Sequence, residues 1–306
     1  MDVSVIIVNY NTCKITKNCL KSVFEQTTGI EFEVIVSDNG SKDGSIEMIR
    51  TDFPQVILIA NNANLGFGTA NNRALAAAKG KYVFYLNSDT LLLNNAVKIF
   101  FDYWENAAEK ETLGALGANL LDMDGHIIHS HGAFPQIDSV VADTVRALYG
   151  TYKLLALNIL FKKQIPICHS EQQANKLLGE VDDVVGADLF LKNDEYAYFD
   201  EQYFMYCEET DLQYRLMQHG KKRLLIDGPE IIHLDGASSK KDAPDTVRVF
   251  STFSSINYNL SRIYFFRKHG ANRFKIFILK TALFFIWLHP FIFPTTKRYL
   301  SKLLKT

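Results

Sequence analysis

Three carboxylates occupy four positions near residue 210 of this chain: Glu208, Glu209 and Asp211. Aromatic residues precede them directly, at Tyr203, Phe204 and Tyr206. Like-charge repulsion and partial loss of water raise the pKa of at least one carboxyl in such a cluster, toward a value useful for a general base. The same spacing is typical of the first turn of a helix, where the helix dipole favours acids. The cluster alone therefore indicates either a catalytic base or a helix start.

Apolar runs that alternate with helical patterns must position this cluster. Four runs predict buried strands, at residues 3–9, 33–37, 56–60 and 82–86, and further strands are expected at 115–121, 184–191 and 223–226. Because these runs are apolar throughout, they predict a mostly parallel α/β sheet with helices on both faces. Polar loops follow the first four strands, at residues 9–12, 38–45, 61–67 and 87–90. Ligands of such sheets bind beyond the carboxyl ends of the strands, so we expect these loops to line one crevice.

Helices are expected between the strands. Asn11 or Thr12 would cap the first helix, a later one would end at Gly80, and a long one would cover residues 91–111. A helical stretch is also expected near residues 140–160, inside a segment, 126–179, whose pattern is otherwise hard to interpret.

The composition is that of a globular chain with a large core. It has 306 residues, of which 47% are hydrophobic and 22% are charged. The four cysteines show neither a CxxC pair nor zinc-like spacing, and the apolar run at 3–8 is too short for a secretory signal. We therefore expect reduced thiols and a cytoplasmic location.

Residues 246–306 differ in charge from the rest of the chain. They contain eleven Lys and Arg and no Asp or Glu, interleaved with Phe, Leu and Ile. The uncharged run at 281–296 holds two prolines and is shorter than the roughly 20 residues of a spanning helix. We therefore expect a basic, aromatic-rich helical extension that lies on a membrane surface, with a core helix or a homodimer contact as alternatives. Nucleic acid is not an expected partner, because the basic residues alternate with apolar ones.

A dinucleotide-binding sheet is one alternative that the strand pattern raises. Asp38 ends the second strand, where a ribose-binding acid would lie. The loop after the first strand contains no glycine, however, and the G-x-G that begins at Gly66 comes after the third strand. Since a lone G-x-G is weak evidence, hydride transfer is not favoured.

Seven segments in a fixed order carry a family resemblance: VSVIIVNYN, SDNGSKDGS, NLGFGTANNRAL, YLNSDT, GADLFLKND, FDEQYFMYCEETDLQYR and IIHLDGASS. Together they resemble the bacterial inverting glycosyltransferases of family 2, which have the GT-A fold, and especially the rhamnosyltransferase-like members. The resemblance extends from about residue 1 to residue 270. It implies a nucleotide-sugar transferase with a catalytic domain at 1–245 and a C-terminal extension at 246–306.

The resemblance places a nucleotide sugar against the strand ends. Asp38 would accept hydrogen bonds from the base or the ribose, and an Asx-turn role for the same side chain is compatible with this. Asn64, Gly66 and Phe67 would wall the base pocket, and Asp188 would bond a sugar hydroxyl. The other nucleotide-sugar contacts that the resemblance implies are Asn9, Asn11, Asn87 and Ser88.

The resemblance also implies a metal site. Asp89 would ligate Mg²⁺ or Mn²⁺, and His233 would be a further ligand or a contact to the diphosphate. Asn87 stands where the family often carries Asp, which weakens the case for a site made of protein ligands alone. The alternative is that Asp89 caps a helix that begins at Leu91.

Inversion at a sugar carbon requires one base that deprotonates the acceptor hydroxyl. The family carries Glu-Asp where this chain has Glu208 and Glu209, so the resemblance implies Glu209 as the base and Glu208 as the alternative. Asp211 and Arg215 lie four residues apart on the expected helix, and we expect them to form a structural ion pair.

The activity implied is transfer of a sugar, rhamnose being favoured, from a dTDP- or UDP-sugar. The acceptor would be a glycan or a lipid-linked oligosaccharide in synthesis of a cell-surface polysaccharide such as O-antigen, at the inner face of the cell membrane. A non-catalytic protein that binds nucleotide sugars or glycans with the same fold is the alternative from another class.

Overall fold

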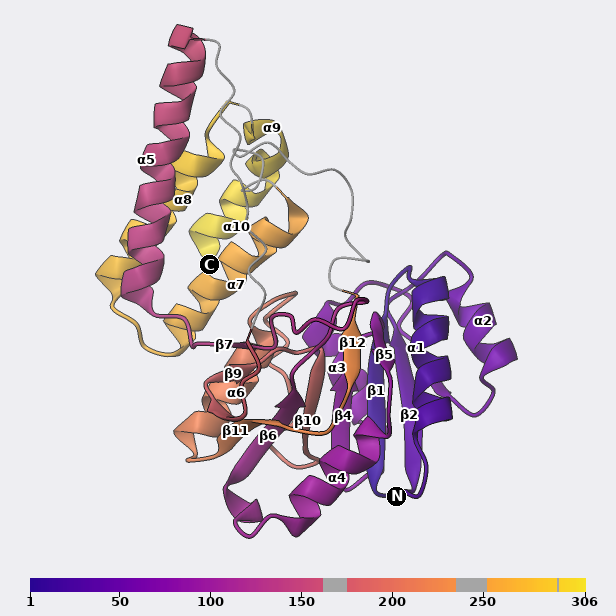
Figure 1. The fold of residues 1–306 in the computed structure, drawn as a ribbon. Coiled ribbons are helices and arrows are strands. Elements are labelled where there is room, and N and C mark those ends of the chain that lie inside the picture. Colours follow the sequence, from indigo (N-terminus) through magenta and orange to yellow (C-terminus); the bar gives the residue numbers. More distant parts are fainter. Residues whose placement is uncertain (162–174, 235–251, 291) are drawn as a thin grey trace. The chain divides into compact units, whose positions relative to one another are not determined.

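The computed structural model of the chain describes residues 1–161, 175–234, 252–290 and 292–306. The chain forms two compact units (Figure 1). The first comprises Met1–Phe134, Gln172–Phe204 and Glu208–Lys240, and the second comprises Pro135–Glu171, Met205–Cys207 and Lys241–Thr306. The second unit thus contains the middle of the chain as well as the basic residues near its end.

The first unit is built on an eight-stranded sheet with the order β3-β2-β1-β4-β10-β6-β11-β8. β10 and β8 run antiparallel to their neighbours, and the other neighbouring pairs are parallel. The mostly parallel α/β sheet expected from the apolar runs is therefore confirmed. The strands are β1 (Val3–Asn9), β2 (Phe32–Asp38), β3 (Ile57–Ala60), β4 (Tyr82–Leu86), β6 (Leu113–Ala118), β8 (Gly179–Val181), β10 (Asp188–Lys192) and β11 (Lys222–Ile226).

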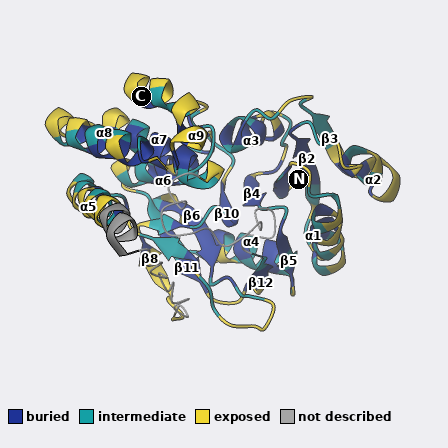
Figure 2. Cartoon of the chain, turned by 90° about the horizontal axis from the view of Figure 1, so that it is seen from above, coloured by how far each residue is buried: buried dark blue, intermediate teal, exposed yellow. Residues whose placement is uncertain are grey.

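Among the residues that the structure describes, five helices flank this sheet: α1 (Cys13–Gln26), α2 (Ser45–Asp52), α3 (Phe67–Leu75), α4 (Ala96–Asn106) and α6 (Glu208–Gln218). Their apolar residues recur at helical spacing, so each helix buries one face. In the core, the ring of Phe190 stacks on Phe100 of α4 at 5.5 Å and on Tyr82 of β4 at 5.3 Å. Figure 2 shows the buried strands in dark blue, with exposed residues on the outer sides of α1 and α2.

Two expected helix boundaries were wrong. A short strand, β5 (Thr90–Leu92), stands where the long helix was expected to begin, and it pairs with β12 (Ile231–His233). α4 is therefore shorter than 91–111. α3 ends at Leu75, and Gly80 serves tight packing instead, because a Cβ at Gly80 would lie 2.4 Å from the backbone nitrogen of Ser4.

The second unit is helical. Its helices are α5 (Ile137–Phe161), α7 (Phe253–Lys268), α8 (Arg273–Trp287), α9 (Phe293–Thr296) and α10 (Leu300–Lys305), with a 3₁₀ turn at Lys297–Tyr299. α5 packs against α8, and Lys275 pairs with Asp138 across these two helices. Leu279, Ile286 and Trp287 of α8 are buried. Among the described residues, no helix is both long enough and apolar enough to cross a bilayer.

Candidate active site

The ends of β1 and β2 form one hydrogen-bonded unit. Asn9 and Asp38 are register partners, and the Asn9 amide donates to Oδ2 of Asp38 at 2.6 Å. The hydroxyls of Thr12 and Thr16 both donate to Oδ1 of Asn9 at 2.7 Å, which fixes the orientation of its amide. Asn9 therefore serves to position Asp38.

Asp38 also organises the loop after β2. Its Oδ1 accepts from the backbone N–H groups of Gly40 at 3.0 Å and Ser41 at 2.8 Å, so the Asx-turn role is confirmed. Asn11, at a positive φ of 54°, accepts from the N–H of Lys42 at 2.8 Å. The two loops after β1 and β2 are thus joined by side-chain to backbone hydrogen bonds.

The first helix begins directly after Thr12, as expected, but its cap hydrogen bond comes from another residue. Thr12 stands at the N-cap position of α1 without a side-chain cap hydrogen bond. The carboxylate of Asp43, from the loop after β2, accepts from the N–H of Cys13 at 2.8 Å instead. A cap that comes from 30 positions away cannot be read from local sequence.

The loop after β3 is held by Asn39, a residue that the sequence had not singled out. Its amide donates to the carbonyl of Gly66 at 3.1 Å, and its Oδ1 accepts from the amide of Asn61 at 3.2 Å. Asn64 accepts from the N–H of Gly66 at 3.0 Å. Asn39 therefore connects the end of β2 with the loop in which the base pocket was expected.

Gly66 occupies a position that only glycine fits. Its φ is +89°, and a Cβ there would lie 2.3 Å from the carbonyl oxygen of Phe204. The next residue, Phe67, donates its N–H to that same oxygen at 3.0 Å. The loop after β3 is thereby fastened to the chain that leads toward α6.

Asn72 makes a second link of this kind. Its amide donates to the carbonyl of Phe199 at 2.9 Å, while its Oδ1 accepts from the N–H of Phe199, also at 2.9 Å. The amide further donates to Glu201 at 3.0 Å. α3 thus orders the segment that precedes the acidic cluster.

Asp89 and His233 lie together beyond the end of β4. Nε2 of His233 is 3.4 Å from Oδ1 of Asp89, and both side chains are largely shielded, at 12% and 11% exposure. The pairing of β5 with β12 creates this contact, because Thr90 is the register partner of His233. The expected alternative, a helix-capping Asp89, was wrong since a strand follows it.

A carboxylate oxygen and an imidazole nitrogen at this separation suit a hard divalent cation. A second candidate group, Asp122, Asp124 and His126, has its potential ligand atoms within 4.8 Å of one another. That group is a turn in which Oδ1 of Asp122 already accepts from the N–H groups of Asp124 and His126. Exposed acids that satisfy a turn are a weaker indication of a metal site than the shielded pair.

The three acids of the cluster lie in the first turn of α6, so the helix-start interpretation of the segment is confirmed. Asp211 is fully buried and accepts from Nε of Arg215 and from the hydroxyl of Tyr203, each at 3.2 Å. The expected structural ion pair is therefore confirmed. Glu208 is buried against α3, because a Cβ added at Gly68 of that helix would lie 3.7 Å from the Cβ of Glu208.

Glu209 packs on Gly186, where an added Cβ would lie 3.2 Å from its Cβ and Cγ. Burial raises the pKa of the Glu209 carboxyl. Glycine at 186 thus leaves room for the glutamate side chain.

Asp183 lies beside Glu209 and had not been identified from the sequence. It belongs to β9 (Asp183–Val184), and its two oxygens accept from the hydroxyl of Thr210 at 2.7 Å and the amide of Gln213 at 2.6 Å. Burial, and next the charge of Glu209, raise the pKa of Asp183 to about 7. Two carboxyls with raised pKa values therefore meet at the start of α6.

The backbone that enters α6 is strained. Tyr206 and Cys207, directly before Glu208, have φ angles of 69° and 64°. Such left-handed conformations cost an ordinary residue of the order of 1–2 kcal/mol each. The position of the acidic cluster is therefore maintained against a local backbone preference.

Asp188, at the start of β10, is fully buried. Its Oδ2 accepts from the N–H of Ala118 at 2.7 Å, so it braces β10 against β6. Oδ1 has no hydrogen-bond partner among the described residues, and burial raises the pKa of the carboxyl well above its usual range. The expected bond to a sugar hydroxyl would have to use this remaining oxygen.

Asn87, directly after β4, contacts the segment on which Glu209 packs. Its N–H donates to the carbonyl of Ala187 at 3.0 Å, next to Gly186. Ser88 lies 3.5 Å from Thr12 through their hydroxyls. The end of β4 thus lies between the loop after β1 and the residues that pack on Glu209.

Comparison with known proteins shows what the chain is similar to. Residues 4–117 match the family Glycosyl transferase family 2. The chain is 27% identical over 223 residues to the N-acetylglucosaminyl-diphospho-decaprenol L-rhamnosyltransferase of Mycobacterium tuberculosis, with 68% of each protein covered. It is 28% identical over 171 residues to the poly(ribitol-phosphate) beta-glucosyltransferase of Bacillus spizizenii, covering 54% of this chain and 26% of that protein.

A solved structure shows the same fold. The mannosyltransferase of Pyrobaculum calidifontis, in complex with GDP-Man and Mn²⁺, matches with a TM-score of 0.54 at 15% identity, covering 99% of this chain and 75% of that one. At this identity the likeness shows the GT-A fold. Residues 4–117 therefore match the glycosyl transferase family 2 model, and the chain has the GT-A fold.

Proposed function

We propose that the chain is an inverting, metal-dependent glycosyltransferase that moves a sugar from a nucleoside diphosphate sugar to an acceptor hydroxyl. One series of contacts carries this proposal. Glu209 packs on Gly186, the carbonyl of the neighbouring Ala187 binds Asn87, and Asp89 follows Asn87 beside His233. A base and a pair of potential metal ligands thus belong to the edge where β4 ends and β10 begins.

Glu209 would accept the proton of the acceptor hydroxyl while that oxygen attacks the anomeric carbon. The bond from this carbon to the diphosphate breaks with its electron pair, the nucleoside diphosphate leaves, and the configuration inverts. The raised pKa of Glu209 supports the assignment, because a general base works best when its pKa is near the operating pH. Glu208, on the buried side of the same turn, is the alternative base.

Asp89 would hold Mg²⁺ or Mn²⁺, since both ions prefer carboxylate oxygens, and His233 would add a neutral imidazole ligand or contact the diphosphate. Such an ion, when bound, neutralises charge on the departing diphosphate. The Pyrobaculum calidifontis structure, which has the same fold, contains Mn²⁺. Asn87 and Ser88, at the same strand end, would contact the nucleotide sugar.

The nucleotide would lie over the ends of β1 and β2. Asp38 is fixed as a hydrogen-bond acceptor by Asn9 and the turn after β2, so it suits the imide N–H of uracil or thymine. Asn64 and Phe67 would border the base. A dTDP- or UDP-sugar is therefore the proposed donor, and the Mycobacterium tuberculosis relative, an L-rhamnosyltransferase, supports rhamnose as its sugar.

The proposed acceptor is a growing cell-surface glycan or its lipid-linked precursor. The names of both relatives support this, because one acts on a diphospho-decaprenol and the other on poly(ribitol-phosphate). A lipid-linked acceptor would place the enzyme at the inner face of the cell membrane, with the basic residues 246–306 toward the lipid. Association into a homodimer stays a prediction.

The test is release of nucleoside diphosphate from a panel of dTDP- and UDP-sugars, with and without Mn²⁺, in the presence of lipid-linked or soluble glycan acceptors. We expect turnover with one donor, loss of it with EDTA, and a product of inverted anomeric configuration by NMR. Donor binding without turnover under every condition would instead favour a non-catalytic binding protein. Activity that survives both EDTA and Asp89→Ala would overturn the metal assignment.

A further inference from the structure

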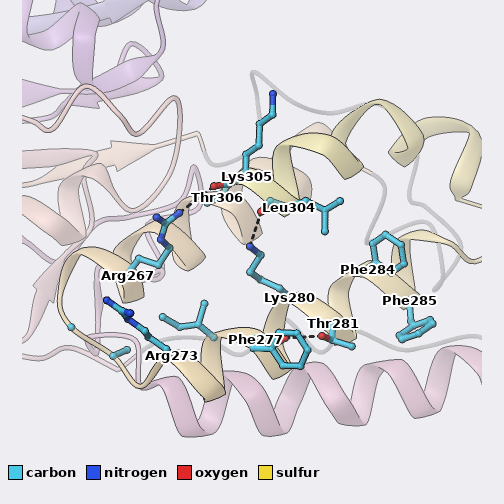
Figure 3. Close-up of a pocket in the computed structure, with 13 residues that line it drawn as sticks. Arg267, Arg273, Phe277, Lys280, Thr281, Phe284, Phe285, Leu304, Lys305 and Thr306 are labelled. Carbon is cyan, nitrogen blue, oxygen red and sulfur yellow. Dashed lines mark hydrogen bonds between the residues drawn. The ribbon is translucent and has the colours of Figure 1, made fainter.

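A groove lies in the second unit, between the end of α7, one face of α8 and the end of α10 (Figure 3). Its volume is about 1070 Å³, which is at the upper end of the range for small-molecule sites. The turn at Gly270 and Ala271 closes one side. The groove is therefore large enough for an elongated ligand.

Four cations line the groove: Arg267, Arg273, Lys280 and Lys305. The side chain of Lys305 points away from the other three (Figure 3). No Asp or Glu is among the described residues that line it, and within the described ranges none of the four cations pairs with a carboxylate side chain. Lys280 donates to the carbonyl of Leu304 at 2.9 Å, and Arg267 to that of Lys305 at 3.2 Å. Lys280 and Arg267 are thus held by neutral carbonyl groups.

The positive charges of Arg267 and Lys280 in the groove repel each other. Burial, and next the charge of Arg267, lower the pKa of Lys280. A bound anion would reverse this effect, because an opposite charge favours the protonated amine. Arginine and lysine together bind phosphate oxygens through charge-assisted hydrogen bonds.

Aromatic side chains line the rest of the groove. Arg273, Phe277, Lys280 and Phe284 follow one another at spacings of three and four residues, so they share a face of α8. Phe277 is 63% exposed and Phe285 is 47% exposed. Figure 3 shows the two arginines at one end of the groove, Phe284 and Phe285 at the other, and Lys280 between them.

We infer that this groove binds one anionic phospholipid, with the phosphate held by Arg267, Arg273 and Lys280 and an acyl chain lying on Phe277 and Phe284. Charge complementarity carries the choice, because the cationic end suits a phosphate and the uncharged aromatic end suits a hydrocarbon chain. A free phosphate would leave the exposed aromatic end uncovered. The inference rests on the proposed function only for its setting at a membrane.

The experiment is co-sedimentation of the full chain with vesicles of phosphatidylcholine, with or without phosphatidylglycerol, in the absence of any nucleotide sugar. We expect binding to the anionic vesicles, weakened by salt, and little binding to phosphatidylcholine alone. The triple variant Arg267→Gln, Arg273→Gln, Lys280→Gln should bind about 10- to 100-fold more weakly, because each cation near a charged surface contributes to affinity.

A matched control removes the same charge from the same unit outside the groove. Lys297, Arg298 and Lys302 are exposed and do not line it, so their replacement by Gln should weaken binding by less than about threefold. If the two triple variants lose vesicle binding equally, the groove is not the site, and the basic residues of this unit attract the vesicle surface without a defined pocket. Absence of binding by the unaltered chain would overturn it as well.

Phe277→Ser tests the apolar half of the site while Arg267, Arg273 and Lys280 remain. We expect about tenfold weaker vesicle binding from the lost aromatic contact, with an unchanged melting temperature. Displacement by soluble glycerol 3-phosphate as effective as displacement by lipid would show a phosphate site instead. A change in sedimentation coefficient in the variants, without vesicles, would show a contact between copies of the chain. Transfer to a soluble acceptor, measured separately, shows whether the proposed function itself holds.

Discussion

Acidic side chains at the strand ends and at the start of α6 lie in opposite environments. Asp38 is buried among donors, since Asn9, Gly40 and Ser41 all direct N–H groups at its oxygens. Glu209 instead packs on Gly186 beside a second carboxyl, Asp183. Asp38 is surrounded by hydrogen-bond donors, whereas burial raises the pKa of the Glu209 and Asp183 carboxyls.

This difference shows how one fold separates binding from proton transfer. Donors from the backbone are abundant where a parallel strand ends in a turn, so acids there suit ligand recognition. The first turn of α6 packs against β9 and Gly186, and burial raises the pKa of the Glu209 carboxyl in this turn and of the Asp183 carboxyl in β9.

Glu209→Gln should lower kcat by about 10²- to 10⁴-fold, because a glutamine amide cannot accept the acceptor's proton. The Michaelis constant for the donor should change little, since Glu209 lies away from Asp38 and its turn. Asp38→Asn should show the opposite pattern, with a raised donor Michaelis constant and a smaller effect on kcat. Steady-state kinetics with the donor varied give both values. A large loss of kcat in Asp38→Asn, without one in Glu209→Gln, would contradict the assignment of proton transfer to Glu209 and donor binding to Asp38.

Gly66→Ala should break the link between the two regions. A methyl group at φ +89° would meet the carbonyl of Phe204 at 2.3 Å, so we expect the free energy of unfolding to fall by about 3 kcal/mol. Gly125→Ala is the matched control, because Gly125 also has a positive φ, of 82°, with no atom within 4 Å. Its cost should be about 1 kcal/mol. Equal costs in denaturant unfolding would mean that the contact with Phe204 contributes nothing.

Local sequence was sufficient for the strands but not for the boundaries of some helices. Continuous apolar runs predicted β1, β2, β4 and β11 nearly to the residue, because a buried parallel strand leaves this pattern by itself. Residues 91–93 are three leucines that suit a helix or a strand equally. Pairing of β5 with β12 decided between them, and that partner lies about 140 positions away in the chain.

The same limit explains which site residues the sequence revealed. Asp38, Asp89 and Glu209 stand in local motifs, so their types and spacing were visible. Asn72 acts on Phe199, 127 positions away, and Asp183 acts on the first turn of α6. Residues whose role consists of a distant contact leave no local pattern, because their partners are set by the folded chain.

Asp183→Asn tests the raised pKa values directly. In the folded chain the Asp183 carboxyl keeps its proton up to about pH 7, whereas the unfolded chain loses it near 3.8. The unaltered protein should therefore lose stability as pH rises from about 4 through 7, by an amount on the order of 3 kcal/mol. The variant should not show this loss, so its advantage should grow with pH in thermal unfolding.

Catalysis provides a second readout for Asp183. Asp183 and Glu209 interact, so Asp183→Asn removes the proton that the two carboxyls together keep up to about pH 7, and the acid limb of the kcat profile should lie at lower pH. Asp182→Asn is the control, since Asp182 is exposed and one position away. If kcat has the same pH dependence in Asp183→Asn and Asp182→Asn, Asp183 does not set the pKa of the proposed base, Glu209.

Tyr203→Phe should have the smallest effect. It tests whether Asp211 is structural and takes part in neither donor binding nor proton transfer. It removes the hydroxyl that donates to Oδ1 of Asp211 at 3.2 Å, while Arg215 keeps its bond to Oδ2. The free energy of unfolding should fall by about 1 kcal/mol. Both kcat and the donor Michaelis constant should stay within about twofold, because Asp211 is paired and fully buried. A tenfold loss of kcat at unchanged stability would instead assign Asp211 to the reaction and contradict its structural role.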